Sequence, residues 1–273
     1  MSRLAIVIVS FNASADLAMA LTSLTSAPPS CDHEVVVVDN ASGDGAPAMV
    51  RARFPTVTVI DAGRNAGFAA ANNIGIRATR GDLVLLLNPD TIVPPGAIDA
   101  LIARLMELPD AGVIGPRIVD GLGHAELSFG SDLSPLREVR RKTLLALDAR
   151  GVGAASRFIE RATSTEREVD WVTGACLLVR RRVAEEAGLL DERYFLYTED
   201  ADFCAAVRER GHRVLFSPVT QIVHLRGRSA PSTGGAAHRA WQQSHLAYYR
   251  KRHPGWAPWL ERYLRLRGLP PDA

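Results

Sequence analysis

Polar side chains follow three apolar segments in the first half of the sequence, each where a buried strand is expected to end. They are Ser10 and Asn12, Asp39, and Asn88 and Asp90. The carboxyl ends of parallel strands lie at one edge of a sheet, so we expect these side chains to converge on one crevice. A single aspartate after a strand is most often a turn former or a helix N-cap. Three polar strand ends together favour a binding site, although the turn interpretation stays open for Asn12.

The oxygen atoms of this set suit a divalent cation and a nucleotide. Mg²⁺ is usually held by one or two protein carboxylates together with substrate phosphates. Asp90 suits that role, and Asn88 can add a neutral oxygen or bond a ribose hydroxyl. Asp39 is placed to accept hydrogen bonds from a base or a ribose. The loops contain neither GxGxxG nor GxxxxGK[ST], so a diphosphate would need its charge met by a cation.

Two further groups in the second half could take part in chemistry. Glu199 and Asp200 stand side by side before an apolar-faced helix. Acids at a helix start complement its dipole, but adjacent carboxylates raise the pKa of one of them, which suits that pair to proton transfer. His224 ends a strand-like run and is followed by Arg226 and Arg228. A lone histidine is usually structural, whereas one beside two arginines can ligate a metal or face phosphates.

The elements that would position these residues alternate between strand and helix. In the first half, strands are expected at 4–10, 34–40, 57–60 and 83–87, and helices at 13–24, 46–54, 66–79 and 95–108. This order predicts a parallel sheet with right-handed crossovers. The pattern weakens at 120–168, where we expect an insertion or long loop with some helix around 138–148. Farther on, we expect a strand at 171–181, helices at 182–187 and 198–210, a short strand at 213–217 and a helical tail at 237–266.

The tail combines arginine and lysine with aromatic residues, and Pro254 and Pro258 interrupt it. Its aromatic residues are Trp241, Tyr248, Tyr249, Trp256 and Trp259. A segment of this composition can lie at a membrane interface. The alternative, which we favour, is a terminal helix that packs its aromatic side chains on the domain.

Composition excludes several classes of protein. The 47% hydrophobic and 23% charged fractions are ordinary for a folded domain, and the formal net charge of +2 gives no indication of nucleic-acid binding. Cys31, Cys176 and Cys204 lack CxxC spacing and are expected to be buried apolar residues in a reducing cytosol. With neither a signal peptide nor an apolar run near the roughly 20 residues that span a bilayer, we expect a cytoplasmic protein. Peripheral contact with the inner face of the cytoplasmic membrane stays open.

The motifs, taken in order, resemble those of inverting family 2 nucleotide-sugar glycosyltransferases of the GT-A fold, particularly rhamnosyltransferase-like members. The matching segments are VIVSFN (7–12), VVVDNASGDG (36–45), NAGFAAANNIGI (65–76), LLLNPDT (85–91), WVTGACLLVRR (171–181), FLYTEDADFCAAVRERG (195–211) and HLRGRS (224–229). Each segment is weak alone, but together they cover most of residues 4–229. The resemblance does not extend to 120–168 and is loose beyond 229.

The resemblance implies a nucleotide pocket with a bound cation. The residues expected to line the pocket are Ser10, Asn12, Asp39, Asn65, Gly67, Asn73 and Asn88. Asn88-Pro89-Asp90 stands at the DxD position, where the last aspartate binds the Mg²⁺ or Mn²⁺ that bridges the donor diphosphate. His224 resembles a further metal ligand, and Arg226 and Arg228 would face the phosphates. Asn88 replaces the first aspartate of the motif, which leaves the cation one fewer charged ligand.

The resemblance also implies the reaction. Asp200 would take the proton of an acceptor hydroxyl, with Glu199 in support, and inversion needs no second nucleophilic carboxylate. The segment with Trp171, Thr173 and Gly174 would lie below the donor and acceptor sugars. The expected donor is a dTDP-hexose such as dTDP-rhamnose, or else a UDP-sugar. The expected acceptor is a saccharide or a polyprenyl-linked saccharide.

The expected fold is α/β, with a mainly parallel sheet flanked by helices in one GT-A domain over residues 1–236. Residues 1–116 would form the nucleotide-binding half, residues 117–236 the acceptor half, and residues 237–273 a basic, aromatic helical extension. Homodimerisation stays open.

Three other functions compete with this interpretation. A nucleotidyltransferase would show a basic, glycine-rich loop soon after the first strand, and residues 10–16 hold no lysine or arginine. A non-catalytic nucleotide- or sugar-binding module agrees with Asn88 but not with the presence of Asp90, Asp200 and His224. A dinucleotide-dependent oxidoreductase would need the glycine fingerprint that the loops lack.

Overall fold

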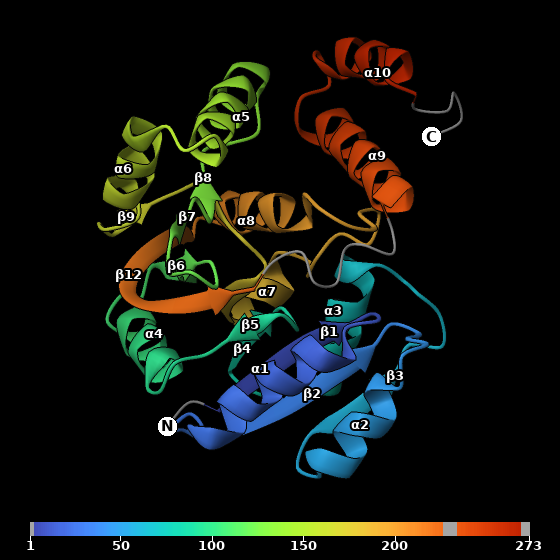
Figure 1. The fold of residues 1–273 in the computed structure, drawn as a ribbon, viewed down its shortest axis with the longest axis vertical. Coiled ribbons are helices and arrows are strands. Elements are labelled where there is room, and N and C mark those ends of the chain that lie inside the picture. Colours follow the sequence, from blue (N-terminus) through green and yellow to red (C-terminus); the bar gives the residue numbers. More distant parts are fainter. Residues whose placement is uncertain (1–2, 226–233, 269–273) are drawn as a thin grey trace.

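The computed structural model describes residues 3–225 and 234–268. Within these residues, ten strands form a mixed sheet at the centre of the molecule, with helices on both faces (Figure 1). The order along the main path of the sheet is β3-β2-β1-β4-β11-β6-β12-β5, while β7 pairs with β6 and β9 pairs with β12.

The first half of the chain forms the elements that the sequence predicts. They are β1 (Leu4–Ser10), α1 (Ser14–Ser26), β2 (His33–Asp39), α2 (Ala46–Arg53), β3 (Thr58–Asp61), α3 (Phe68–Ala78), β4 (Leu83–Leu87) and α4 (Ala97–Met106). Strands β1 to β4 are parallel neighbours. Every residue of β1 and β4 is buried, which explains why these strands appear in the sequence as unbroken apolar runs.

The second half adds antiparallel strands to the sheet, which is mainly parallel, as expected. Strand β11 (Cys176–Arg180) runs antiparallel to both β4 and β6 (Ala111–Val119), and β12 (Arg213–His224) runs parallel to β6. Strand β6 was not predicted because glycine and proline interrupt its apolar pattern. Gly115 is needed there, since a Cβ atom would lie only 2.7 Å from Cβ of Val172.

The strand predicted at 171–181 is interrupted. Its first part, β10 (Trp171–Val172), pairs with β8 (Phe129–Gly130) in a separate two-stranded sheet, and its second part is β11. Thr173, Gly174 and Ala175 connect the two parts. Strand β12 is longer than predicted and continues to His224 past a register shift between Ser217 and Gln221.

Residues 120–168 contain more regular structure than predicted. They form β7 (Ala125–Glu126), β8, α5 (Pro135–Ala149), α6 (Gly153–Ala162) and β9 (Arg167–Glu168). Helix α5 contains the helix expected around 138–148 and extends it at both ends, although none of its residues is buried. Helices α7 (Arg181–Glu186) and α8 (Glu199–Glu209) lie close to their predicted ranges.

Helices cover the sheet through two hydrophobic clusters. On one face, Leu17 of α1, Val50 of α2 and Leu101 of α4 share a cluster with Ile8 and other strand residues. On the other face, helices α3, α7 and α8 pack over the sheet together with part of the tail. Cys176 and Cys204 are buried, as expected, whereas Cys31 is only partly buried. No helix among the described residues is long and apolar enough to cross a bilayer.

The tail forms two helices, α9 (Gly234–Arg252) and α10 (Ala257–Leu266), with Pro254 in the break between them. Tyr248 and Tyr249 of α9 are buried, and their hydroxyl groups donate to Asp132 Oδ1 at 2.6 Å and Glu138 Oε1 at 2.7 Å. The aromatic side chains of α9 therefore pack on the domain, as the favoured interpretation of the tail predicts.

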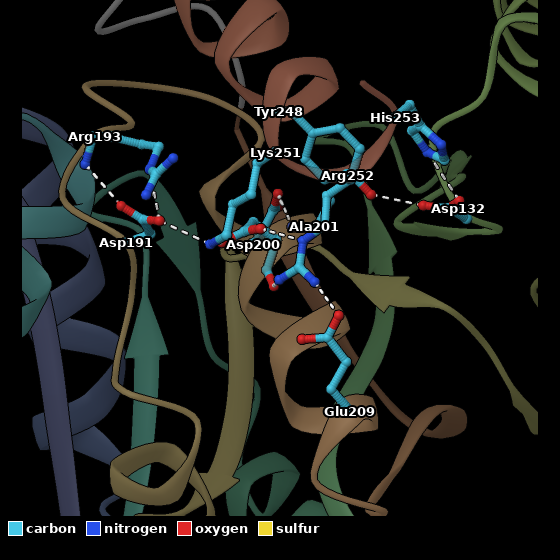
Figure 2. A network of polar contacts seen from close by, with 11 residues as sticks. Asp132, Asp191, Arg193, Asp200, Ala201, Glu209, Tyr248, Lys251, Arg252 and His253 are labelled. Carbon is cyan, nitrogen blue, oxygen red and sulfur yellow. Dashed lines mark hydrogen bonds and ion pairs between the residues drawn. The ribbon is translucent and has the colours of Figure 1, made fainter. Parts of the chain in front are cut away.

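A network of charged side chains ties α9 to the first turn of α8 (Figure 2). The Asp202 side chain is only 2% exposed, and it accepts from Lys251 Nζ at 2.7 Å and from Arg252 Nε at 2.6 Å. Lys251 also contacts Asp191 Oδ2 at 2.8 Å, and Arg252 contacts Glu209. Asp202 thus lies in the first turn of α8 and also anchors the tail.

We expect Asp202→Ala to lower the free energy of unfolding by roughly 3 kcal/mol or more, because it leaves two partly buried cations without their shared partner. Chemical denaturation measures the change. Glu209→Ala is the matched control on the same helix: its side chain is 64% exposed, and its loss should cost less than about 1 kcal/mol. Equal losses in the two variants would contradict a special role for Asp202.

Candidate active site

The loops after β1 and β2 meet at one edge of the sheet, as predicted from the polar strand ends. Ser10 is the register partner of Asp39, and Asn40 N donates to Ser10 O at 2.8 Å. Asn12 N donates to Ser42 Oγ at 3.0 Å, and Asn12 Oδ1 accepts from Gly43 N at 2.8 Å. Asn12 therefore helps to hold the two loops together, and its predicted contact with a nucleotide stays a prediction.

Asp39 and Ser10 carry polar atoms that the described residues leave without partners. The Asp39 side chain is almost fully buried, and Oδ2 accepts from Ser42 N at 3.0 Å. Asp39 Oδ1 and Ser10 Oγ are buried, and neither has a hydrogen-bond partner among the described residues. Buried polar atoms are rarely left in this state because desolvation without a hydrogen bond is costly. A ligand hydroxyl or ring N–H at this edge would relieve both atoms.

A tight loop before α3 forms the neighbouring wall. The side-chain Nδ2 atom of Asn40 donates to Asn65 Oδ1 at 2.9 Å, and its Oδ1 atom accepts from Ala66 N at 2.9 Å. Gly67 has φ of +86°, and a Cβ atom there would lie 2.4 Å from the carbonyl oxygen of Phe195. Only glycine suits this conformation and this close approach. Asn40 was not among the predicted site residues, although its place directly after Asp39 was a usable signal.

Asn73 has a structural role in α3. Its Nδ2 atom donates to Leu190 O at 2.8 Å and to Glu192 Oε1 at 2.9 Å, and its Oδ1 atom accepts from Leu190 N at 3.1 Å. The side chain is buried and joins α3 to the segment that precedes α8. Its predicted contact with the nucleotide stays a prediction.

Asp90 and His224 come into contact at the end of β4. The pairing of β12 with the short strand β5 (Thr91–Ile92) places His224 opposite Thr91. His224 Nε2 lies 3.1 Å from Asp90 Oδ1 and 3.4 Å from Asn88 Nδ2, while its Nδ1 atom lies 3.8 Å from Glu126 Oε2. Glu126 was not predicted, because a two-residue strand such as β7 leaves no periodic signal.

The donors at this edge fit a cation that is shared with a substrate. In residues 3–225 and 234–268, no three His, Cys, Asp or Glu side chains are grouped so as to hold a metal by themselves. Asp90 and His224 nevertheless supply an oxygen and a nitrogen donor in direct contact. Mg²⁺ and similar ions commonly complete their shell with waters and substrate phosphates. Arg226 and Arg228, the predicted phosphate contacts, lie outside the described residues.

Asp200 is held at the start of α8 by backbone N–H groups. Its Oδ2 atom accepts from Gly174 N at 3.0 Å and its Oδ1 atom from Ala201 N at 2.8 Å. Burial raises the pKa of the Asp200 carboxyl above its usual range, and these N–H groups, with Arg141 nearby, offset part of the rise. The carboxylate is therefore oriented, and it is more basic than an exposed aspartate.

The residues before the acidic pair have an unusual backbone. Tyr197 and Thr198 have φ of +71° and +69°, a left-handed conformation that side chains other than glycine and asparagine seldom adopt. Such strain concentrates at functional sites, where surrounding contacts enforce it. Here the turn directs Glu199 and Asp200 inward at the amino end of α8.

Glu199 differs from Asp200 in its environment. Its side chain is nearly fully buried, and Oε2 has no hydrogen-bond partner within the described part of the chain. Burial, and then the charge of Asp200, raise the pKa of Glu199 well above its usual range. Of the two carboxyl groups, Glu199 thus favours its protonated form more strongly than Asp200 does.

A pocket of about 330 Å³ opens beside Asp200. Trp171 and Thr173 line it, as do Arg141 and Lys142 of α5 and Trp241 of α9. The Arg141 guanidinium lies 4.8 Å from the Trp171 ring centre, and Lys142 Nζ lies 5.1 Å from that of Trp241. The sequence could not place α5 or α9 at this pocket, because both lie in segments that the motifs do not cover.

Known proteins share both the sequence and the fold. Residues 5–188 match the model of Glycosyl transferase family 2. The chain is 32% identical to the N-acetylglucosaminyl-diphospho-decaprenol L-rhamnosyltransferase of Mycobacterium tuberculosis, over 81% of this chain and 76% of the relative. It is 27% identical to the low-salt glycan biosynthesis hexosyltransferase Agl10 of Haloferax volcanii, over 81% of this chain and 66% of that relative.

Two solved structures establish the fold class. GalNAc-T7 with UDP, GalNAc and Mn²⁺ has a TM-score of 0.64 at 17% identity, covering 91% of this chain and 48% of that chain. The mannosyltransferase PcManGT from Pyrobaculum calidifontis, in complex with GDP-Man and Mn²⁺, has a TM-score of 0.61 at 18% identity, covering 95% and 68%. This chain thus spans about half the length of GalNAc-T7. The GT-A expectation is confirmed, and because the family model matches well over half of the chain, the protein belongs to glycosyl transferase family 2.

Proposed function

We propose that this enzyme moves a hexosyl group from a nucleoside-diphosphate sugar to a hydroxyl of a saccharide, with inversion at the transferred carbon. One observation carries the proposal. Asn88 N donates to Ala175 O at 2.9 Å, and the adjacent Gly174 N donates to Asp200 Oδ2 at 3.0 Å. The short segment 174–175 therefore bonds both to the motif that carries Asp90 and to the candidate base. A leaving group and an attacking hydroxyl need this juxtaposition.

The donor would lie along the edge formed by β1, β2 and β4. Asp39 Oδ1 and Ser10 Oγ would receive the base or ribose, which satisfies two buried atoms. Asp90 and His224 would hold Mg²⁺ or Mn²⁺, and the ion would offset the charge of the departing diphosphate. This donor class is supported by the two structural neighbours, one of which was solved with UDP and Mn²⁺ and the other with GDP-Man and Mn²⁺. We propose a dTDP- or UDP-linked sugar, with rhamnose favoured by the mycobacterial relative.

The acceptor would enter the pocket beside Asp200. An acceptor hydroxyl that donates to the Asp200 carboxylate loses its proton to it while the hydroxyl oxygen attacks the anomeric carbon. The attack comes from the face opposite the bond to the diphosphate, which inverts the configuration. The N–H groups of Gly174 and Ala201 fix the carboxylate, so little reorganisation is needed during the transfer. The aromatic rings of Trp171 and Trp241 offer apolar faces to a sugar ring.

The class of acceptor follows from the relatives. The name of the mycobacterial relative includes a diphospho-decaprenol-linked sugar, and this supports a polyprenyl-linked saccharide as acceptor here. The principal alternative is a nucleotide-binding module without catalysis, which agrees with the replacement of the first DxD aspartate by Asn88. The activities of the Asp200→Asn and Glu199→Gln variants separate these two functions.

Asp200→Asn should lower turnover by a factor on the order of 10² to 10⁴ while donor binding stays nearly unchanged, because shape is kept and basicity is lost. Glu199→Gln is the comparison and should cost less, since Glu199 favours its protonated form. In the wild type, turnover should fall on the acid side at a pH above the usual aspartate range, as protonation removes the base. Initial-rate assays with a nucleotide sugar as donor measure turnover and its dependence on pH. Full activity in both variants would reduce the acidic pair to a helix cap.

Asp90→Ala should abolish transfer and remove the extra thermal stabilisation that Mn²⁺ gives to the nucleotide complex, because the variant lacks the only carboxylate of the DxD position. Melting without ligand shows whether the fold survives. Asp82→Ala is the matched control at the opposite end of β4, where an exposed carboxylate accepts from Arg3 N. Near wild-type turnover in folded Asp90→Ala would exclude this residue as the metal ligand.

Asp39→Ala should weaken the binding of the free nucleoside diphosphate by a factor on the order of 10 to 100, the effect of losing a hydrogen bond to a charged group. Calorimetry measures the affinity. Asp61→Ala is the control, because Asp61 ends the neighbouring strand in register with Asp39 but is exposed. If both variants bind equally well, Asp39 is a turn residue.

A further inference from the structure

Helix α10 has an apolar face that no described part of the chain covers. Trp256, Trp259, Tyr263 and Leu266 are 54%, 68%, 56% and 82% exposed, and their spacing of three and four residues places them on one side of the helix. The opposite side is buried: Leu264 packs on Leu246 of α9. Exposed aromatic and leucine side chains in a continuous stripe mark an interaction surface.

Basic side chains border this stripe. Arg262, Arg265 and Arg267 are exposed, and Arg267 lies 6.0 Å from the ring centre of Tyr263. Glu261 is the single acidic residue of α10, and it pairs with Arg265 at 2.6 Å and with Arg250 at 3.1 Å. The helix therefore presents aromatic rings together with an excess of positive charge.

Helix α5 presents a second surface of the same kind. Leu136 and Val139 are 71% and 60% exposed, and no residue of α5 is buried. Arg137 and Arg140 are exposed beside them. In Figure 1, α5 and α10 both stand at the end of the molecule that is uppermost in the view, with α9 descending from α10 toward the sheet.

We propose that α10, together with α5 at the same end of the molecule, docks this protein on an anionic lipid surface. Helices that lie in the plane of a membrane interface have this composition: an apolar face with tryptophan, and arginine or lysine at its border. Tryptophan and tyrosine rings favour the headgroup level, and each arginine near an anionic surface adds to the attraction. A second copy of the chain suits the face less well, because a two-fold contact would bring the two sets of arginines together.

Docking would place the acceptor pocket near the lipid. The pocket beside Asp200 is lined by Lys142 of α5, which belongs to the proposed surface, and by Trp241 of α9, the helix on which α10 packs. Trp241 also packs in the same cluster as Leu264 of α10. A polyprenyl-linked acceptor could then extend its saccharide from the membrane into the pocket. This consequence rests on the proposed function, whereas the docking does not.

The test is co-sedimentation of the full chain with vesicles of phosphatidylcholine and phosphatidylglycerol, compared with phosphatidylcholine alone. The wild type should bind the anionic vesicles, and binding should fall as salt rises, because screening weakens the arginine contribution. Trp259→Ser combined with Tyr263→Ser should lower the partition coefficient on the order of tenfold or more. Arg262→Ala combined with Arg267→Ala should lower it on the order of 25-fold, at about fivefold for each arginine.

Leu122→Ser combined with Val219→Ser is the matched control. Both residues are exposed apolar side chains outside α5 and α10, and this variant should bind vesicles as the wild type does. Absence of wild-type binding at low salt, or equal binding by the Trp259/Tyr263 variant, would overturn the proposal. The proposal would also be overturned if the wild type does not bind vesicles and light scattering shows that it is a dimer, while the Trp259/Tyr263 variant is a monomer. The Trp259/Tyr263 variant should still transfer sugar to a water-soluble acceptor. A loss of vesicle binding is thereby distinguished from a failure of the proposed transferase activity.

Discussion

The hydrogen bond from Gly174 N to Asp200 Oδ2 is the contact on which the arrangement of the site depends. It exists because the chain leaves the sheet between β10 and β11, so that the N–H of Gly174 points at α8 instead of at a neighbouring strand. Gly174 also lies against Phe68, where an added Cβ atom would come within 3.2 Å of the ring. The next residue, Ala175, binds the backbone of Asn88. One interruption of a strand thus sets the position of Asp200 relative to the strand end that carries Asp90.

The buried carboxylates of Asp39, Asp200 and Asp202 differ in the groups that bind them. Asp200 and Asp202 stand two residues apart in the sequence, and both fit an acidic helix start. In the structure Asp202 is compensated by Lys251 and Arg252, whereas backbone N–H groups bind the Asp200 carboxylate. Asp39 keeps one oxygen without a partner among the described residues. A buried carboxylate that no ion pair neutralises is costly for stability, so carboxylates held mainly by backbone N–H groups, or left with a buried oxygen without a partner, suit a ligand or a reaction.

The sequence predicts well the polar strand ends at the edge formed by β1, β2 and β4, and it predicts poorly the elements around the pocket beside Asp200. The reason is physical. Strands β1, β2 and β4 are buried and parallel, so each is an apolar run with its polar residue at the end, and local pattern suffices. Strand β6 escapes detection because Gly115 and Pro116 break its run. The helix expected around 138–148 is present as α5, but its place at the pocket beside Asp200 was not predicted because none of its residues is buried. Glu126 joins His224 only through pairing between distant segments. Such long-range contacts leave no periodic signal in the chain.

The C-terminal tail connects three functions that the sequence presents as one basic, aromatic segment. The end of α9 supplies Lys251 and Arg252 to Asp202 on α8, and an earlier part of α9 supplies Trp241 to the pocket beside Asp200. Helix α10 packs on α9 and turns its own aromatic side chains outward. The family model ends at residue 188, so Asp200, this wall of the pocket and the outward surface all lie beyond the matched region. Because Lys251 and Arg252 of α9 pair with Asp202, the position of the tail and the position of the first turn of α8 depend on each other.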